Sequence, residues 1–362
     1  MDDGDEIRAL EKIKGIIEKN DFKYIGKVGG GGFGTVSLAS KDNRLFAIKV
    51  VLPKKDKKLD LEMVKEFRGR NIVKVMQEKQ SDRANNNYYL YVMEPSFIGS
   101  LKEFNEYLDA NLIFKEAFVE KFGDNLMRFF VMQLVNAFQE LYIGNLVHFD
   151  IKPDNILIFK NLELKVIDFS FLKKLVPEKR DRIPGGTFGY ITPEYFSSNL
   201  YDNETLFKQD YFALGAVIYY LKYGLRLVEY GRTGIDYMDL NNVRESINKA
   251  IDSIKSQKCH DKDFIEFLVS LIQFRPNERL NFESIIRNKW LNKNKQEINK
   301  IIHINLIDED NIVLELQKSD FLIDNTKHYR IEKFDKLYNN EKENKKYKQV
   351  RKGKFKFGRR KN

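Results

Sequence analysis

A glycine cluster at residues 29–34 lies between two short runs that read as β-strands, and it restricts the fold of this chain strongly. The runs, at 22–28 and 35–39, are rich in β-branched and aromatic residues, as is a third at 45–51. Runs of this kind separated by glycine and polar turn residues predict antiparallel strands. Glycines also let backbone amides approach an anion closely, so the cluster suggests a phosphate-binding loop.

The context of the cluster decides between this loop and a flexible turn, which is the commoner role of an isolated glycine run. In a dinucleotide-binding fold the glycines would open a helix, and this sequence provides a strand instead. The pattern G-x-G-x-x-G-x-V is formed by Gly29, Gly31, Gly34 and Val36. Thirteen residues after Val36, the triplet Ala47-Ile48-Lys49 places a lysine on an apolar strand. An ammonium group buried beside phosphates would have a clear role there.

Length and composition set the class of protein. The chain has 362 residues, of which 42% are apolar, enough for one large domain or two lobes. It contains no run of about 18 apolar residues, so no membrane span is expected. The acidic start at 1–6 argues against a secretory signal, and the single Cys259 excludes an intramolecular disulfide. We expect an intracellular protein, cytoplasmic or nuclear.

The order of the patterns predicts an α+β fold with two lobes. Further strand-like runs occur at 72–77 and 88–93, with a helical pattern at 59–67 between the two groups of strands. From residue 96 to residue 291 the apolar spacing is mainly helical. We therefore predict an N-lobe at 22–94, with a small antiparallel sheet and one main helix, and a larger, mostly helical C-lobe at 96–291.

Both ends extend beyond this domain. Residues 1–21 carry isoleucine and leucine at near-helical spacing, which predicts an amphipathic helix that packs on the small lobe or recruits a partner helix. Residues 292–336 form an extension with a possible hairpin, and 337–362 form a basic tail that we expect to be disordered. Eleven Lys/Arg and two Glu at 341–362 account for +9 of the net charge of +10, so the body is nearly neutral.

Two more segments place carboxylates next to apolar runs. Residues 148–155 read H-F-D-I-K-P-D-N, and Asp168-Phe169-Ser170 begins thirteen residues beyond Asn155. The set resembles the protein-kinase family, whose motifs occur in this order. The motifs that carry the resemblance are the glycine loop, 47–49, 148–155, 168–170 and 192–194. The resemblance covers about 22–291 and implies a two-lobed protein-kinase-like fold.

The resemblance implies a serine/threonine protein kinase that transfers the γ-phosphoryl group of ATP to hydroxyls of protein substrates. Phosphoryl transfer needs positioning and charge neutralisation more than covalent help. By resemblance, Asp150 orients the substrate hydroxyl, Lys152 lies against the γ-phosphate, and Lys49 holds the α- and β-phosphates. Asn155 and Asp168 are hard oxygen ligands suited to Mg²⁺, with Mn²⁺ as a possible substitute. A lysine two residues after the aspartate is the serine/threonine-type feature of the family.

The resemblance also assigns nucleotide contacts and scaffold residues. Met93 would lie at the gate of the adenine pocket, with the Glu94 carbonyl and the Ser96 amide as adenine contacts. The other nucleotide-binding positions are Gly29, Gly31, Gly34, Val36 and Ala47. Three further positions match scaffold roles, namely Thr187 beside the catalytic loop, Asp210 as the acid that braces it, and Arg279 as the partner of Glu194.

Several positions depart from the family pattern. Phe149 replaces an arginine that normally clamps a phosphate on the activation segment, and 171–186 contains no Ser, Thr or Tyr. We therefore expect activity without activation-segment phosphorylation. Ser170 replaces the glycine of D-F-G, and Thr192 replaces the alanine of A-P-E.

The acid that should pair with Lys49 is left between two candidates. Alignment favours Asp60, which is followed four residues later by the apolar Val64, while Glu62 is the longer acid nearby. Only eleven residues separate Asp60 from Lys49. These departures leave a second hypothesis open, a nucleotide-binding pseudokinase that acts as a scaffold.

The basic tail has two interpretations. A tail rich in Lys and Arg is often only a solvated extension. Residues 352–361 also interleave aromatic residues with cations, a pattern that suits RNA, an anionic membrane or a nuclear import receptor.

Overall fold

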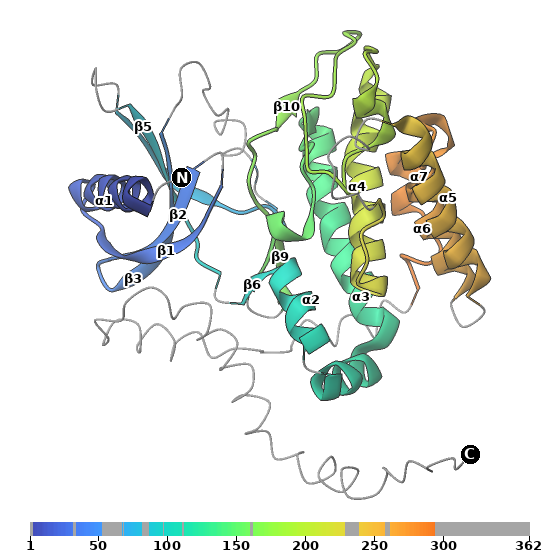
Figure 1. The fold of residues 1–362 in the computed structure, drawn as a ribbon, viewed down its shortest axis with the longest axis horizontal. Helices are drawn as coiled ribbons and strands as arrows, with labels where there is room; N and C mark the ends of the chain where they lie inside the picture. Colours follow the sequence, from blue (N-terminus) through green and yellow to red (C-terminus); the bar gives the residue numbers. More distant parts are fainter. Residues whose placement is uncertain are drawn as a thin grey trace, which may run out of the picture.

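A computed structural model places an antiparallel sheet and a mostly helical body side by side (Figure 1). The structure describes residues 3–31, 34–52, 67, 69–81, 87–96, 98–110, 112–159, 162–228, 239–257 and 261–293. The helix predicted at 59–67, with both candidate acids, lies outside these residues except for Phe67, and so do the predicted hairpin and the basic tail.

Five strands form the sheet, in the order β1-β2-β3-β5-β4 with every neighbour antiparallel. The strands are β1 (Lys23–Gly31), β2 (Gly34–Lys41), β3 (Arg44–Val51), β4 (Val75–Ser81) and β5 (Tyr88–Met93). Asp42 and Asn43 connect β2 to β3 with φ of 49° and 57°. Two left-handed residues twist a tight hairpin in the same sense as its strands, and Asp and Asn tolerate that conformation.

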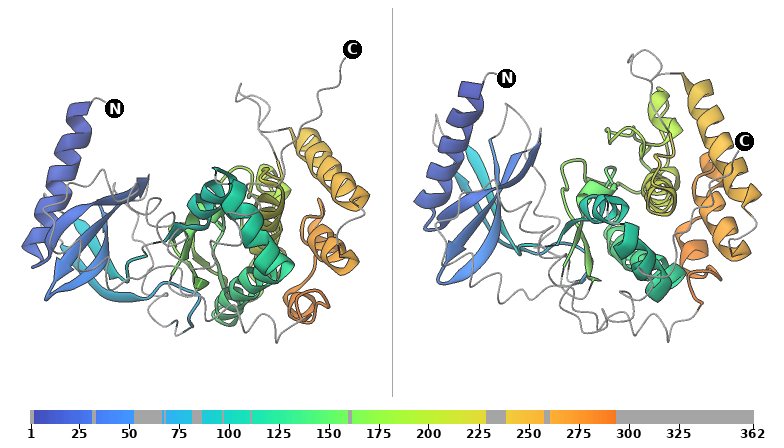
Figure 2. Two further views of the ribbon diagram at one scale, coloured as in Figure 1. Left: turned by 90° about the horizontal axis from the view of Figure 1, so that it is seen from below. Right: turned by 60° about the horizontal axis from the view of Figure 1, so that its bottom comes forward.

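The helix α1 (Asp3–Lys19) covers one face of this sheet. Ile13, Ile16 and Ile17 of α1 form one apolar cluster with residues of β3 and β5, including Ile48 and Val50. Because side chains alternate along a strand, Lys49 between these two points to the opposite face. Figures 1 and 2 show α1 on the side of the sheet that faces away from the helical body.

The helical body is built around α3 and α4, which pack against each other. Its helices are α2 (Leu101–Ala110), α3 (Leu112–Ile143), α4 (Asn203–Tyr223), α5 (Leu240–Ser256), α6 (Lys262–Leu271) and α7 (Phe282–Ile286). Its short strands are β6 (Gly99–Ser100), β7 (Leu146–Val147), β8 (Ile156–Ile158), β9 (Leu164–Val166) and β10 (Lys173–Lys174). These strands pair as β6-β8-β9 and β10-β7, and they carry the loops of the site.

The strand predicted at 72–77 begins later than the sequence indicates. β4 starts at Val75, whereas Ile72 and Val73 lie against β9 of the helical body. The Val73 amide donates to the Val166 carbonyl at 3.0 Å, and the Val166 amide donates to the Asn71 carbonyl at 2.9 Å. Ile72 and Val73 are both buried in the larger core, and this burial outweighs extension of the sheet.

The predicted fold class is confirmed: an antiparallel sheet lobe is followed by a larger, mostly helical lobe. Among the described residues, no helix is long and apolar enough to cross a membrane.

Candidate active site

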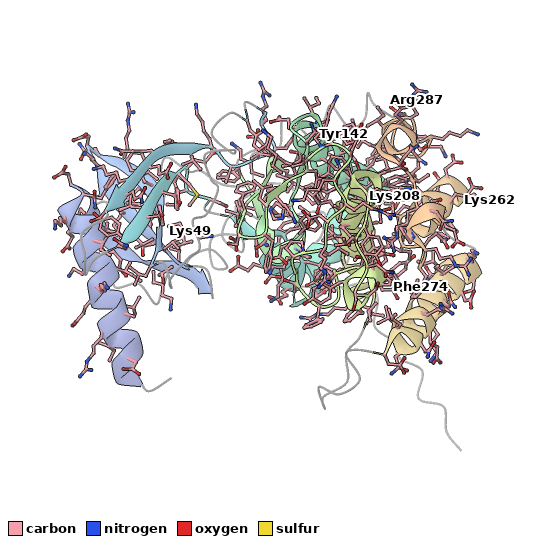
Figure 3. All side chains as sticks on the ribbon, turned by 90° about the horizontal axis from the view of Figure 1, so that it is seen from above. Lys49, Tyr142, Lys208, Lys262, Phe274 and Arg287 are labelled. Atoms are coloured by element: carbon pink, nitrogen blue, oxygen red, sulfur yellow. The ribbon has the colours of Figure 1, made fainter. Side chains whose placement is uncertain are left out.

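Lys49 joins the sheet lobe to the helical lobe. It lies in β3 opposite Tyr91 of β5, and its ammonium group is 2.6 Å from Asp168 Oδ1, in the loop after β9. Figure 3 shows Lys49 in the sheet lobe, apart from the other labelled residues, which belong to the helical lobe. The side chains of Lys49 and Asp168 are 12% and 26% exposed, so the ion pair is partly shielded from water.

Asp168 is held in an unusual conformation by specific contacts. Its φ of 62° is left-handed, which costs a non-glycine residue energy and is often found at functional sites. The Ser170 hydroxyl donates to Oδ1, the oxygen that also contacts Lys49, at 2.5 Å. Burial alone would raise the pKa of Asp168, but the charge and hydrogen bond of Lys49, with the Ser170 hydroxyl, hold it below its usual value. The carboxylate is therefore ionised at neutral pH.

Asp210 of α4 supports the loop 148–155 through hydrogen bonds. The amides of His148 and Phe149 donate to its two carboxylate oxygens at 2.8 and 2.9 Å, the arrangement expected from the sequence. Phe149 has a φ of 64°, so these hydrogen bonds hold a turn that a bulky residue adopts only at a cost. Burial raises the pKa of Asp210 to about 7, although the two amides favour its charged form.

His148 is fully buried between the two carboxylate loops. Its Nε2 lies 3.0 Å from the Ile167 carbonyl, and its Nδ1 accepts the Asp150 amide at 3.2 Å. Both contacts are satisfied only when the proton is on Nε2. Burial lowers the pKa of His148, so the ring is neutral and links the two loops through its two contacts.

Asp150 lies at the centre of a network of short contacts. Thr187 donates its hydroxyl hydrogen to Asp150 Oδ1 at 2.6 Å and accepts from Lys152 Nζ at 2.6 Å. Lys152 also donates to Asp150 Oδ2 at 2.9 Å. The side-chain amide of Asn155 donates to the Asp150 carbonyl and to Asp150 Oδ2, at 2.8 and 2.9 Å. A carboxylate held in this way can accept a hydrogen bond from a hydroxyl group. An ammonium group then lies beside the oxygen of that hydroxyl.

The glycine loop and the β3–β5 pair complete one side of the site. Gly29 pairs with Val36, Gly31 pairs with Gly34, and Ala47 pairs with Met93. Gly34 has φ of 134°, and a Cβ there would lie 2.7 Å from the Val50 carbonyl oxygen, so only glycine fits. The predicted phosphate loop thus lies at the β1–β2 hairpin, with Val36 directly opposite Lys49 in the sheet register.

The segment predicted to contact adenine connects the lobes. Met93 ends β5, where it packs against the large core. The Glu94 carboxylate is 2.7 Å from Lys165 Nζ, and the Ser96 hydroxyl donates to the Ile158 carbonyl at 2.6 Å. These side-chain contacts fix the segment to β8 and β9.

The donor set fits a nucleotide with a hard cation. The side-chain amide of Asn155 donates twice to Asp150, so its oxygen is the atom that could coordinate a cation, and Asp168 could add an ionised carboxylate. In the described part of the chain, no group of three or more His, Cys, Asp or Glu could hold a metal. Mg²⁺ typically binds to one or two protein oxygens and completes its coordination with water and substrate phosphates, which agrees with this set.

The segment from Ser170 to Glu194 is anchored at several points. β10 pairs with β7, and Lys173 forms an ion pair of 2.6 Å with Asp181, which itself bridges to Tyr201. Phe149, which replaces the family arginine, is buried in the core.

Glu194 closes the segment through a pair that the sequence predicts. Both carboxylate oxygens accept from the Arg279 guanidinium at 2.9 Å, and both side chains are buried.

Sequence reasoning missed two contacts at the site. The sequence marks Ser170 only as a replacement of the D-F-G glycine, whereas in the structure its φ is not left-handed and its hydroxyl binds Asp168. A hydroxyl two residues from an acid in a tight loop was the available signal. The Lys173–Asp181 pair had no comparable signal, because residues eight apart in a loop have no fixed spacing.

Comparisons with known proteins agree with this geometry. Residues 22–291 match the family model described as the protein kinase domain. The chain is 28% identical over 290 residues to developmentally-regulated protein kinase 1 of Dictyostelium discoideum, covering 75% of this chain and 36% of that protein. It is 25% identical over 291 residues to Aurora kinase of Saccharomyces cerevisiae, covering 80% of this chain and 74% of that protein.

A serine/threonine-protein kinase of Arabidopsis thaliana is 25% identical over 303 residues, covering 80% of this chain and 58% of that protein. The chain thus spans about a third of the length of the Dictyostelium relative. Because the family match covers most of the chain and the fold agrees with it, this chain belongs to the protein kinase family.

Proposed function

We propose that this chain is an ATP-dependent protein kinase that phosphorylates serine and threonine hydroxyls, with 22–291 as its catalytic domain. The observation that carries the proposal is the contact set of Asp150, in which a hydroxyl group lies 2.6 Å from both a carboxylate oxygen and an ammonium nitrogen. A substrate hydroxyl that replaced Thr187 there would meet a hydrogen acceptor and a cation at once.

In the proposed mechanism each residue has one task. Asp150 accepts the hydrogen bond of the substrate hydroxyl and orients its oxygen for attack. Lys152 and Lys49 neutralise negative charge, while Asn155 and Asp168 supply oxygens for a cation. Bound ATP with Mg²⁺ provides the phosphoryl group and a good leaving group. Positioning and charge neutralisation of this kind are the main protein contributions to phosphoryl transfer.

We propose further that activity does not depend on phosphorylation of the activation segment. Phe149 is buried, and the segment is anchored by the Lys173–Asp181 and Glu194–Arg279 pairs without a phosphate. Protein treated with a phosphatase should keep its kcat within about twofold, as checked by intact-mass spectrometry and a peptide assay. Activity that disappears on phosphatase treatment and returns on rephosphorylation of Ser170, Thr187, Tyr190 or Thr192 would contradict this.

A pseudokinase scaffold is the second candidate, and one observation favours it. Asp168 Oδ1 is already engaged by both Lys49 and Ser170, which leaves a single carboxylate oxygen for a cation. A scaffold would bind nucleotide without transfer.

The test offers ATP, Mg²⁺ and peptides that contain a single Ser, Thr or Tyr to the purified chain. Mass spectrometry of the peptides identifies the acceptor, and the shift of melting temperature with ATP reports binding. We expect phosphorylated Ser and Thr peptides and an unmodified Tyr peptide. A melting shift without phosphorylation of any peptide would favour the scaffold, and modified Tyr alone would contradict the serine/threonine assignment.

A further inference from the structure

The segment that leads to Thr187 carries a group of exposed cations. Lys174, Lys179, Arg180 and Arg182, here called the cationic strip, are all exposed. Among the residues that the structure describes, none of the four has an acidic partner within salt-bridge distance.

The acids nearby neutralise the cationic strip only in part. Residues 173–182 hold five Lys/Arg against two acids, Glu178 and Asp181, and Asp181 is bound to Lys173 at 2.6 Å. Asp202 lies close enough to Arg180 for the two charges to interact, and Asp181 interacts in the same way with Lys179, so five cations face three acids. The acid two residues further along α4, Glu204, pairs with Lys208 at 3.0 Å. The strip therefore keeps a net positive charge.

Phosphorylation within 171–186 cannot supply an anion for the strip. Residues 171–186 contain no Ser, Thr or Tyr, so no phosphate can be attached within the segment. The basic residues at 341–362 carry +9 and would be repelled by the strip. The anion that complements the strip is thus expected on another molecule.

Arg182 of the strip lies within reach of the proposed phosphoacceptor position. Arg182 is five residues before Thr187, whose hydroxyl contacts Asp150, and five residues span at most about 17 Å. Two acids near Asp150 have partners of their own. Asp154 is 3.2 Å from Lys102, and Glu103 accepts the Ser100 amide at 2.8 Å.

We propose that the cationic strip binds Asp and Glu side chains that flank the phosphoacceptor, so that the substrates of this kinase are acidic protein segments. This inference rests on the proposed function and adds the substrate class. Exposed charges of this kind act on the encounter and on KM rather than on the chemical step, and their effect falls as salt is added.

The test uses the full chain and three peptides with one serine, in which the flanking positions are all Glu, all Gln or all Lys. We expect kcat/KM for the Glu peptide to exceed that of the Gln peptide at least tenfold at 50 mM salt, and the ratio to approach one at 500 mM. The Lys peptide should be the poorest substrate. A fourth peptide with flanking phosphoserines separates carboxylate from phosphate recognition, and a gain only with phosphoserine would overturn the proposed chemistry.

The variant Lys174→Ala/Lys179→Ala/Arg182→Ala removes three charges of the strip. Each exposed charge pair contributes modestly to binding, and the contributions of three pairs multiply. The ratio of kcat/KM between the Glu and Gln peptides should therefore fall roughly 3- to 100-fold through a change in KM, with kcat within about twofold. The matched control, Arg8→Ala/Lys12→Ala/Lys19→Ala on α1, removes the same residue types from the sheet lobe and should keep the wild-type ratio. Reversal with Lys179→Glu/Arg182→Glu should make the Lys peptide the better substrate.

The outcomes separate this inference from the proposed function. Equal kcat/KM for all three peptides would leave the kinase assignment intact and overturn the proposed role of the strip. An equal fall of the Glu/Gln ratio in both triple variants would do the same. If none of the three peptides is phosphorylated, both the kinase assignment and the proposed role of the strip are overturned. The acidic run 308–310 is a competing occupant within the chain. We expect Asp308→Asn/Glu309→Gln/Asp310→Asn to leave KM for the Glu peptide unchanged, and a fall of more than about threefold would show that these acids cover the strip instead.

Discussion

Asp168 Oδ1 receives two partners at once, the ammonium group of Lys49 at 2.6 Å and the hydroxyl of Ser170 at 2.5 Å. The first partner comes from the sheet lobe and the second from the loop of Asp168 itself. The carboxylate is therefore oriented from both sides, and its other oxygen is the one that remains for a ligand.

Removal of the Ser170 hydroxyl should loosen this carboxylate. A hydrogen bond to a charged group contributes on the order of 1.5–3 kcal/mol, and part of that is lost to solvent at this partly exposed position. We expect Ser170→Ala to raise the Mg²⁺ concentration for half-maximal ATP binding about three- to tenfold, measured by fluorescence titration. Ser170→Thr keeps the hydroxyl and should restore the wild-type value. An unchanged or lower Mg²⁺ requirement in Ser170→Ala would contradict the proposed orienting role.

The raised pKa of Asp210 predicts a pH dependence of stability. An unfolded aspartate titrates near 3.9, and burial raises the pKa of Asp210 in the folded chain to about 7. The folded state thus holds the proton more tightly, and its contribution to stability is present below pH 4 and lost as pH rises to 7. The total is at most about 4 kcal/mol.

Asp210→Asn removes this titration but loses one acceptor for the two amides of the turn. We expect the variant to be less stable than wild type at pH 5 in urea unfolding, with the difference narrowing towards pH 7.5. A difference that widens with pH would contradict the sign of the shift.

The Arg279–Glu194 pair should be sensitive to loss of one partner. The side chains are 0% and 5% exposed, so Arg279→Leu leaves a buried carboxylate without its cation, at a cost of about 3–5 kcal/mol. Arg275→Leu is the control, because Arg275 is 70% exposed and only 3.7 Å from Glu278, and it should cost less than about 1 kcal/mol. Equal urea midpoints for the two variants would show that the buried pair contributes nothing special.

The packing of α1 predicts that this helix stabilises the sheet lobe. Ile17 is fully buried, so Ile17→Ala should cost about 2–5 kcal/mol and lower the melting temperature by several degrees. Ile7 lies in the same helix but is 57% exposed, and Ile7→Ala should change the melting temperature by less than about 2 °C. If both variants melt like wild type, α1 is not part of the folded lobe.

Local patterns predicted the elements that depend on neighbours in sequence. The β-branched and aromatic content of 45–51 predicted β3 and placed Lys49 on a strand, and the spacing of apolar residues predicted α1. The sequence offered two roles for the α1 stripe, and the structure shows Ile13 and Ile16 against the sheet while Ile7 remains exposed.

Contacts between distant parts of the chain were not predictable in this way. Ile72 has the β-branched character of a strand residue, yet its backbone pairs with Val166 because a core is available there. Lys173 and Asp181 meet because β10 and the bridge to Tyr201 fix the two ends of their loop, which no local pattern encodes. The order of the motifs predicted which residues lie together. The distances among these residues follow from tertiary packing.

The most direct test of the proposed active site is transfer of radiolabel from γ-labelled ATP to a serine peptide by wild type and by Asp150→Asn. The variant keeps the size of the side chain but loses the charge that accepts the hydroxyl hydrogen. We predict that incorporation falls by about 10²–10⁴-fold while ATP binding changes less than about threefold. Equal incorporation by the two proteins would contradict the assignment of Asp150, and with it the active site described above.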